Sequence, residues 1–264
     1  MKSLLKALDI VDRIAEAGSA GIRELSATTG FPPATIHRIV STLVERRYLK
    51  QDPVTKRYAL ALRFLELGTR VQQQFHLASL ARPHLERLMA ETKESTNLAV
   101  KDGDEMVYLD HVRSDYSLLQ LFTRPGARVP LYATGVGKLF LSLMSESACD
   151  VYLRQTRRKP YTPKTLVDRK NLLREIARIR TQGFSVDNEE FETGVRCVAA
   201  LVYNHNRQPV AAVSISGAVV RITPERIEHF GMLIKRCALA ISKELGFNDV
   251  KTFTPNNRKE IDYA

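Results

Sequence analysis

Two adjacent prolines that run straight into a helical pattern constrain this chain more than any other feature. Residues 31–43 read F-P-P-A-T-I-H-R-I-V-S-T-L. Proline has no backbone N–H and is tolerated in the first turn of a helix, so the pair predicts a turn followed by a helix over residues 33–46. One face of this helix is apolar, formed by Ile36, Ile39, Val40 and Leu43. The opposite face carries small or hydrogen-bonding side chains, namely Ala34, Arg38, Ser41 and Thr42, with Thr35 and His37 beside them.

The segments around this helix predict a winged helix-turn-helix. Residues 4–17 and 22–29 have the apolar spacing of two further helices. After the third helix, residues 48–60 have the pattern of a hairpin around an Asp52-Pro53 turn, with basic residues at and beside its tip. In this motif the second helix of the pair enters the DNA major groove and the hairpin can flank it. A solvated surface helix would also have a polar face, but it would not require this order of elements.

Composition permits an anionic partner and argues against a membrane protein. The 264 residues carry 40 Lys and Arg against 29 Asp and Glu, a formal net charge of +11. Residues 1–68 hold 11 basic and 7 acidic residues, a net +4, so the excess is spread along the chain. No segment approaches the roughly 20 apolar residues that span a bilayer. The three cysteines are too scattered for a disulfide framework or a zinc site, and we expect a cytoplasmic protein.

Beyond the hairpin, the pattern stays helical and then changes its period. Residues 61–80 continue as helix into a polar glutamine run, which is typical of a linker, and the apolar stripe of this helix suits dimerisation. Residues 82–93 start a new helical pattern after Arg82-Pro83. A period of two in the apolar residues then predicts strands over residues 96–101, 105–112 and 118–122. The first two of these strands are joined by a turn at Asp102-Gly103-Asp104.

The remaining elements complete an α+β domain. A glycine-rich turn opens a short helix near residue 138, and residues 165–182 are helical and basic on one side. Two buried strands, 195–203 and 209–216, precede a final amphipathic helix over 224–246. Hairpin-joined strands with helices at their ends indicate an α+β sensor domain rather than a doubly wound parallel sheet. Four parts are predicted. They are a winged helix-turn-helix domain (1–66), a linker helix (67–81), a sensor domain (82–247) and a poorly ordered polar tail (248–264).

The segment A-T-G-V-G-K (133–138) does not meet the requirements of a phosphate-binding loop. That loop needs a glycine five residues before the Gly-Lys pair and Ser or Thr after the lysine, whereas Tyr132 and Leu139 occupy these positions. What remains is a glycine-rich helix start. Its free backbone N–H groups either hold an anion such as a carboxylate or belong to a tight turn between strand and helix.

The sequence contains no catalytic or metal-binding pattern. Cys197 lacks an activating base nearby, because His205 is eight residues away across a predicted turn. The six histidines do not have the spacing of zinc motifs. The acidic run Glu189, Glu190 and Glu192 is interpreted as a solvated loop. We therefore expect no catalytic residue, no metal and no cofactor.

Two serines near the end of the chain call for partners. Ser214 and Ser216 alternate with apolar residues along a predicted strand, so their hydroxyls point to the same side of the sheet. Leaving a buried hydroxyl unpaired costs about 1–3 kcal/mol. A bound polar ligand would satisfy both groups, and so would neighbouring backbone.

A set of constrained positions links the two halves of the chain to one family. G-F-P-P-A-T-I-H-R-I-V-S-T-L (30–43) occupies the position of a reader helix. Further on, small residues, acidic residues and a final hydrophobic-aromatic-Asn triplet stand at fixed spacing. These residues are Gly183, Asp187, Glu190, Cys197, Val198, Ala199, Val202, Tyr203 and Asn204. With these residues the chain resembles, along nearly its whole length, the IclR family of bacterial transcriptional regulators.

This resemblance implies a GAF-like effector domain that holds a small molecule, and dimers that pair into tetramers on operator DNA. By similarity to members that bind small keto acids, the pocket falls on Leu118, Leu121, Gly135, Val136, Asp187, Cys197, Ser214 and Ser216. The expected effector is a small organic acid, either a short keto or hydroxy acid or an aromatic carboxylate. Many members have serine where this chain has Ala34, so we expect one phosphate contact fewer and a different operator affinity or sequence.

We therefore interpret the chain as a ligand-responsive, DNA-binding regulator of a catabolic operon. Arg38 and Thr42 are expected to meet base edges, and the DNA backbone is expected to be contacted by Thr35, His37, Ser41, Lys56 and Arg57. Two other functions stay open: an architectural DNA-binding protein whose second domain only oligomerises, and a metabolic enzyme that uses Cys197 or Asp187.

Overall fold

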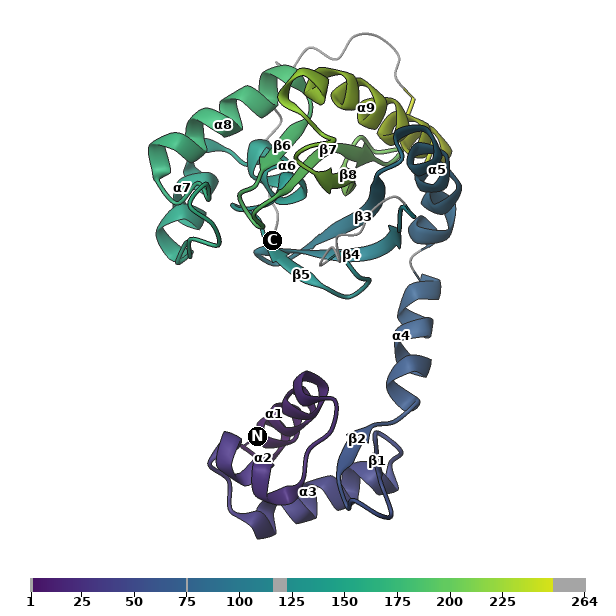
Figure 1. Cartoon of the computed structure of the whole chain (residues 1–264), viewed down its shortest axis with the longest axis vertical. Coiled ribbons are helices and arrows are strands. Elements are labelled where there is room, and N and C mark those ends of the chain that lie inside the picture. The colour runs from purple at the N-terminus through teal and green to yellow at the C-terminus, as the bar shows by residue number, and fades with distance from the viewer. Residues whose placement is uncertain (1, 75, 116–122, 249–264) are drawn as a thin grey trace. The chain divides into compact units, whose positions relative to one another are not determined.

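The computed structural model describes residues 2–74, 76–115 and 123–248 (Figure 1). The chain divides into two compact units, residues 1–75 and residues 76–264, and each is described by itself. The strand predicted at 118–122 lies outside the described residues, and so does the predicted tail beyond residue 248.

Unit 1 has the element order of a winged helix-turn-helix, as predicted. Its elements are α1 (Lys2–Ala17), α2 (Ile22–Thr29), α3 (Pro33–Glu45), β1 (Leu49–Gln51), β2 (Tyr58–Leu60) and α4 (Arg63–Gln74). Gly30 ends α2 in the left-handed conformation, with φ of 71°. Pro32 follows in an extended conformation and Pro33 is the first residue of α3, so the two prolines form the turn and open the helix.

The first three helices and the hairpin of unit 1 share one apolar core. Its buried residues come from α1, the segment after α1, α2, α3 and both strands, and are Ile10, Ile14, Ala20, Leu25, Ile36, Val40, Leu49 and Tyr58. The hairpin is antiparallel, with Leu49 opposite Leu60. A backbone bridge between Ala20 and Tyr58 also joins the hairpin to the segment after α1.

Unit 2 is an α+β domain built on an antiparallel sheet. Its helices are α5 (His76–Thr92), α6 (Gly135–Leu143), α7 (Glu146–Gln155), α8 (Arg169–Gln182) and α9 (Ile227–Glu244), with a 3₁₀ turn η1 (Pro224–Arg226) before α9. Its strands are β3 (Ser95–Asp102), β4 (Glu105–Val112), β5 (Arg128–Pro130), β6 (Ser185–Asn188), β7 (Val195–Tyr203) and β8 (Pro209–Ala218). The strand order is β5-β4-β3-β8-β7-β6, and every neighbouring pair is antiparallel.

Alternate residues of this sheet face two different helix layers. Leu98, Val198 and Val213 pack with α5 and α9 on one face. Their neighbours Ala99, Ala199 and Ala212 pack with α6 and α8 on the other. The larger branched residues therefore meet the long helices, while the alanines let α6 approach the sheet closely. Figure 1 shows α5 and α9 covering one side of the sheet.

The structure differs from the predicted helix boundaries between residues 61 and 93. α4 ends at Gln74 and α5 runs from His76 to Thr92, so the predicted linker 67–81 covers the end of one helix and the start of the next. Pro83, which was expected to separate two helices, lies inside α5. Buried Ala81, Leu85 and Leu88 carry the apolar stripe of α5 past the proline, and this packing outweighs the lost hydrogen bond.

Within the described residues, no helix is long and apolar enough to cross a membrane.

Candidate functional site

Helix α3 is anchored by its apolar face in unit 1. Ile36 and Val40 are fully buried, and Ile39 and Leu43 pack partly buried against the same core. These are the four residues that the sequence pattern assigned to the inner face. The opposite face of α3 is fixed by this packing and points to solvent.

The exposed face of α3 carries the residues predicted to meet DNA. Thr35 is half-buried, and the exposed members are Ala34, His37, Arg38, Ser41 and Thr42. Thr42 Oγ1 donates to the Arg38 carbonyl at 3.0 Å, so the oxygen of this hydroxyl remains an acceptor on the surface. The Arg38 guanidinium extends from the same turn of the helix.

The hairpin has a fixed tip and two different basic residues. Asp52 Oδ1 accepts from the backbone N–H of Val54 at 2.9 Å and of Thr55 at 2.7 Å, which closes the predicted turn. The next residue, Lys56, has φ of 56° and an exposed side chain. The geometry of the tip therefore holds Lys56 at the surface.

Arg57 is instead joined to the rest of unit 1. Its Nε donates to Ser19 Oγ at 3.0 Å and its Nη2 to the Ser19 carbonyl at 2.7 Å. Nη1 donates to Glu24 Oε1 at 2.9 Å, and this contact lowers the pKa of Glu24. Arg57 braces the hairpin against α2, and Lys56 is the hairpin residue better placed for a phosphate.

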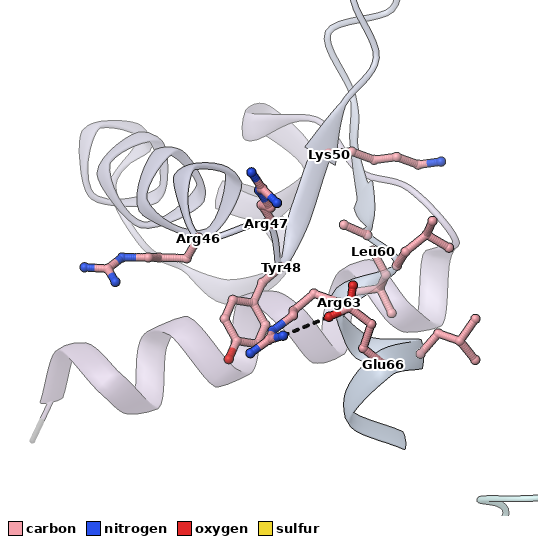
Figure 2. A pocket seen from close by; sticks show the side chains of 10 residues that line it. Arg46, Arg47, Tyr48, Lys50, Leu60, Arg63 and Glu66 are labelled. Atoms are coloured by element: carbon pink, nitrogen blue, oxygen red, sulfur yellow. Dashed lines mark hydrogen bonds and ion pairs between the residues drawn. The ribbon is translucent and has the colours of Figure 1, made fainter. Parts of the chain in front are cut away.

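An open groove lies between the end of α3, the hairpin and α4 (Figure 2). It is lined by Arg46, Arg47, Tyr48, Lys50, Leu60, Ala61, Leu62, Arg63, Leu65 and Glu66. In Figure 2 Arg46 and Lys50 extend away from each other, and Arg63 pairs with Glu66 at 2.8 Å. The cations do not converge on one point, so the groove adds positive charge to unit 1 without forming an anion site.

A small cavity in unit 2 lies on the face of the sheet that carries α6. Its lining residues are Tyr108, Thr123, Val129, Thr134, Asp187, Phe191, Glu192, Val195, Cys197 and Ser216. Asp187 and Cys197 face each other as a register pair of β6 and β7, and Cys197 pairs in turn with Ser216 of β8. Strand pairing thus brings together three of the residues that were predicted to hold the effector.

The start of α6 adjoins this cavity through Thr134. Thr134 is the N-cap, and its Oγ1 accepts from the Gly137 N–H at 3.2 Å. The predicted residues Gly135 and Val136 are the first two of the helix and are buried. A Cβ at Gly137 would overlap the backbone of Leu131, so the strand-to-helix turn requires glycine there.

Ser214 does not line the cavity but is tied to Ser216 by a residue that the sequence analysis missed. Asn97 of β3 is fully buried, and its Nδ2 donates to Ser214 Oγ at 3.0 Å and to Ser216 Oγ at 3.1 Å. Asn97 Oδ1 lies 2.7 Å from His111 Nδ1. The two serines therefore share a side-chain partner, a third possibility beside the ligand and the backbone that the pattern suggested. Leu118 and Leu121 lie outside the described residues.

A buried ion pair lies behind the cavity, and the sequence analysis did not predict it. Lys138 of α6 is 0% exposed; its Nζ pairs with Glu190 and donates to the Val186 carbonyl at 2.7 Å. The interpretation of Glu190 as part of a solvated loop was wrong, since Glu190 is only 5% exposed. The Glu190 N–H donates to Asp187 Oδ1 at 2.7 Å. The pKa of Asp187 is raised to about 7, mainly by burial and secondly by the charge of Glu190.

The chemistry around Cys197 does not suit a nucleophile. Burial raises the pKa of its thiol, and the Asp187 charge raises it further, so the reactive thiolate is disfavoured. His205 is exposed in the β7–β8 turn and forms no pair with it. Among the described residues, no group of His, Cys, Asp and Glu side chains could hold a metal ion.

Comparison with known proteins agrees with this architecture. The family description "IclR helix-turn-helix domain" matches residues 3–53, and "Bacterial transcriptional regulator IclR C-terminal" matches residues 69–243. The transcriptional repressor IclR of Escherichia coli is 32% identical over 249 residues, covering 93% of this chain and 90% of the relative. The regulator KdgR of the same species is 31% identical, with 94% of each chain covered.

Solved structures give the same result. The crystal structure of the Thermotoga maritima IclR protein has a TM-score of 0.77 and 35% identity, and the match covers 94% of this chain and all of that one. A regulator from Rhodococcus, described as putative, has a TM-score of 0.80 at 28% identity, covering 93% and 98%. These relatives are transcriptional regulators with a helix-turn-helix domain and not enzymes. This chain belongs to the IclR family of bacterial transcriptional regulators.

Proposed function

We propose that this DNA-binding regulator senses a small organic acid in the cavity of unit 2 and controls a catabolic operon in response. The observation that carries the proposal is the convergence of Asp187, Cys197 and Ser216 on one cavity beside the N-cap of α6. Backbone N–H groups at a helix start favour a carboxylate, and the apolar lining suits the body of a short keto, hydroxy or aromatic acid. A relative from Salmonella typhimurium is named the acetate operon repressor.

On the DNA side, α3 would lie in the major groove. Arg38 and Thr42 would read base edges, while the half-buried Thr35 and the exposed His37, Ser41 and Lys56 would contact phosphates. We no longer include Arg57 among the phosphate contacts, because its Nε, Nη1 and Nη2 each donate to Ser19 or Glu24. The methyl side chain of Ala34 offers no hydroxyl to a phosphate at the first turn.

The active form would be a homodimer, with two dimers pairing on DNA in the cytoplasm. Exposed leucines in unit 1 support self-association: Leu4, Leu5 and Leu8 of α1, Leu62, and Leu65 of α4 are each more than half exposed. Sedimentation of the full chain with and without operator DNA measures this assembly. A monomer at all concentrations would contradict it.

A thermal-shift screen of keto, hydroxy and aromatic carboxylic acids tests the effector site. An acid that stabilises the protein should also change operator affinity, and Ser216→Ala should weaken both effects. Ser145→Ala is a matched control, because Ser145 is an exposed hydroxyl that caps α7 away from the cavity. If no acid changes DNA binding, the alternative of an architectural DNA-binding protein is favoured.

A further inference from the structure

The interior behind the cavity holds one lysine against two carboxyl groups. Lys138 and Glu190 form a buried ion pair, and the Glu190 backbone N–H donates to Asp187 Oδ1 at 2.7 Å. Asp187 is only 4% exposed and lines the cavity. The three groups come from α6, from β6 and from the loop after β6, so they meet only in the folded unit.

The charges of this cluster do not balance if both carboxyl groups are ionised. Lys138 can neutralise one carboxylate, and it contacts Glu190 directly. Glu190 Oε2 has no hydrogen-bond partner among the described residues, so the charge of Glu190 depends on Lys138 and on one long contact from the Asn188 N–H. Asp187 beside it accepts from the backbone N–H groups of Glu190 and Phe191 but has no cation of its own, and its burial outweighs these two hydrogen bonds and favours the protonated form.

The other titratable groups around Asp187 supply no compensating cation. Burial raises the pKa of each of them, and in its ionised form each would add negative charge and not positive charge. They come from β4, from the loop after β6 and from β7, and are Tyr108, Glu192 and Cys197. From α8, the negative charge of Glu175 acts on Glu190.

We propose that this cluster holds a proton on Asp187, so that Asp187 meets the effector as a hydrogen-bond donor and not as a carboxylate. The proposal rests on the proposed effector site and specifies its chemistry. The effector then presents a carboxylate or carbonyl oxygen to Asp187, and a ligand with an ammonium or amide N–H at that point is disfavoured.

The hydrogen bonds of Ser216, two strands away from Asp187 on the same sheet, have the same polarity. Asn97 Nδ2 donates to Ser216 Oγ, which occupies a lone pair of this oxygen, and the Ser216 hydroxyl hydrogen is within hydrogen-bonding reach of the Cys197 thiol. Ser216 also lines the cavity. An effector oxygen that replaces the thiol as the partner of this hydroxyl would meet two donors, Ser216 and Asp187, and such a pair selects a ligand rich in acceptor oxygens.

Infrared difference spectroscopy of the free, full-length protein tests the proton directly. A protonated carboxyl group absorbs apart from ionised ones, and ordinary surface carboxyl groups are ionised by pH 6. At pH 6 the wild type minus Asp187→Asn difference should contain one protonated-carboxyl band, and it should fade with a midpoint near pH 7. Asp187→Asn keeps the shape of the side chain and its acceptor oxygen, so the variant is expected to fold.

A second variant changes the charge beside Asp187 and keeps the Asp187 carboxyl group. Glu190→Gln leaves Lys138 without its carboxylate, so Asp187 should ionise to neutralise the lysine, and the band should disappear although Asp187 is present. Absence of the band in wild type at pH 6, or its persistence in Asp187→Asn, would overturn the proposal. No effector is added in this experiment, so a failure of every acid to bind would remove the proposed function without changing the spectrum.

Discussion

The exposed face of α3 and the cavity of unit 2 use similar side chains in opposite environments. On α3 the Thr42 hydroxyl bonds the carbonyl four residues earlier, and Arg38 and Ser41 face solvent. Around the cavity, Asn97 bonds serines 117 and 119 residues away, and Lys138 bonds a glutamate 52 residues away. Polar groups on α3 are therefore available to a partner without cost to the fold, whereas those of the cavity are part of the fold.

The largest effect should come from Lys138→Met. Removing one partner of a buried ion pair leaves the other charge uncompensated and costs about 3–5 kcal/mol. The free energy of unfolding of unit 2 from urea denaturation measures this loss. Lys164→Met is the matched control, because Lys164 pairs with Glu189 on the surface, with 53% of its side chain exposed, and such pairs contribute at most about 1 kcal/mol. Equal losses for both variants would contradict the buried role.

A second large loss is expected from Ile36→Ala on the inner face of α3. Ile36 is fully buried, and truncating such a residue costs about 2–4 kcal/mol in transfer and cavity terms. The unfolding of unit 1 should shift by this amount, and affinity for all DNA should fall with it. Glu45→Ala on the exposed side of the same helix should stay within about 0.5 kcal/mol.

Arg38→Ala should separate stability from recognition. Because Arg38 is exposed, the free energy of unfolding should hardly change, while discrimination between operator and random DNA should fall by about 1–3 kcal/mol. Competition binding with both DNAs measures the discrimination. An equal loss on both would show that Arg38 contacts phosphates and not bases.

A pH dependence should distinguish the cavity from α3. Burial raises the pKa of Asp187 from 3.8 to about 7, so between these values the folded protein binds a proton that the unfolded chain releases. Stability from this group is therefore present at low pH and is lost as pH rises toward 7, by at most about 1.4 kcal/mol per pH unit. Asp187→Asn should remove that slope from the unfolding of unit 2. An unchanged slope would assign it to other groups.

The smallest effect is expected from Lys56→Ala at the tip of the hairpin. Affinity should fall alike for every DNA sequence, and the slope of log affinity against log salt should decrease by about one unit. Titrations at several salt concentrations measure the slope. Arg57→Ala is an informative comparison, because losing the contacts of Arg57 with Ser19 and Glu24 should lower the stability of unit 1 and not remove a phosphate contact.

The sequence predicted most of unit 1 because the necessary signals lie close together along the chain. The spacing of Ile36, Ile39, Val40 and Leu43 predicted the buried face of α3, and the prolines predicted its start. In unit 2 the hairpin of β3 and β4, the long strands β7 and β8, and α9 were predicted as well. The short strands β5 and β6 were not predicted, since three or four strand residues carry too little periodicity, and the helix α7 was not predicted either.

The cavity could be predicted only in part. That the Ser214 and Ser216 hydroxyls share a side follows from strand geometry, and the sheet confirms it. The partner roles of Asn97 and Lys138 do not follow from local pattern, because they depend on which distant strands become neighbours. Lys138 stands in the glycine-rich segment, but its neighbours along the chain do not indicate its distant partner Glu190.

The central position of β3 has a consequence for how the molecule is made. β3 pairs with β4 on one side and with β8 on the other, so the middle of the sheet is complete only after residues 209–218 have been synthesised. Unit 1 has its own core within the first 75 residues and can fold while the rest of the chain is still emerging from the ribosome. Each new molecule should thus acquire its DNA-binding domain first, and the arrival of β8 should complete the part that regulates it.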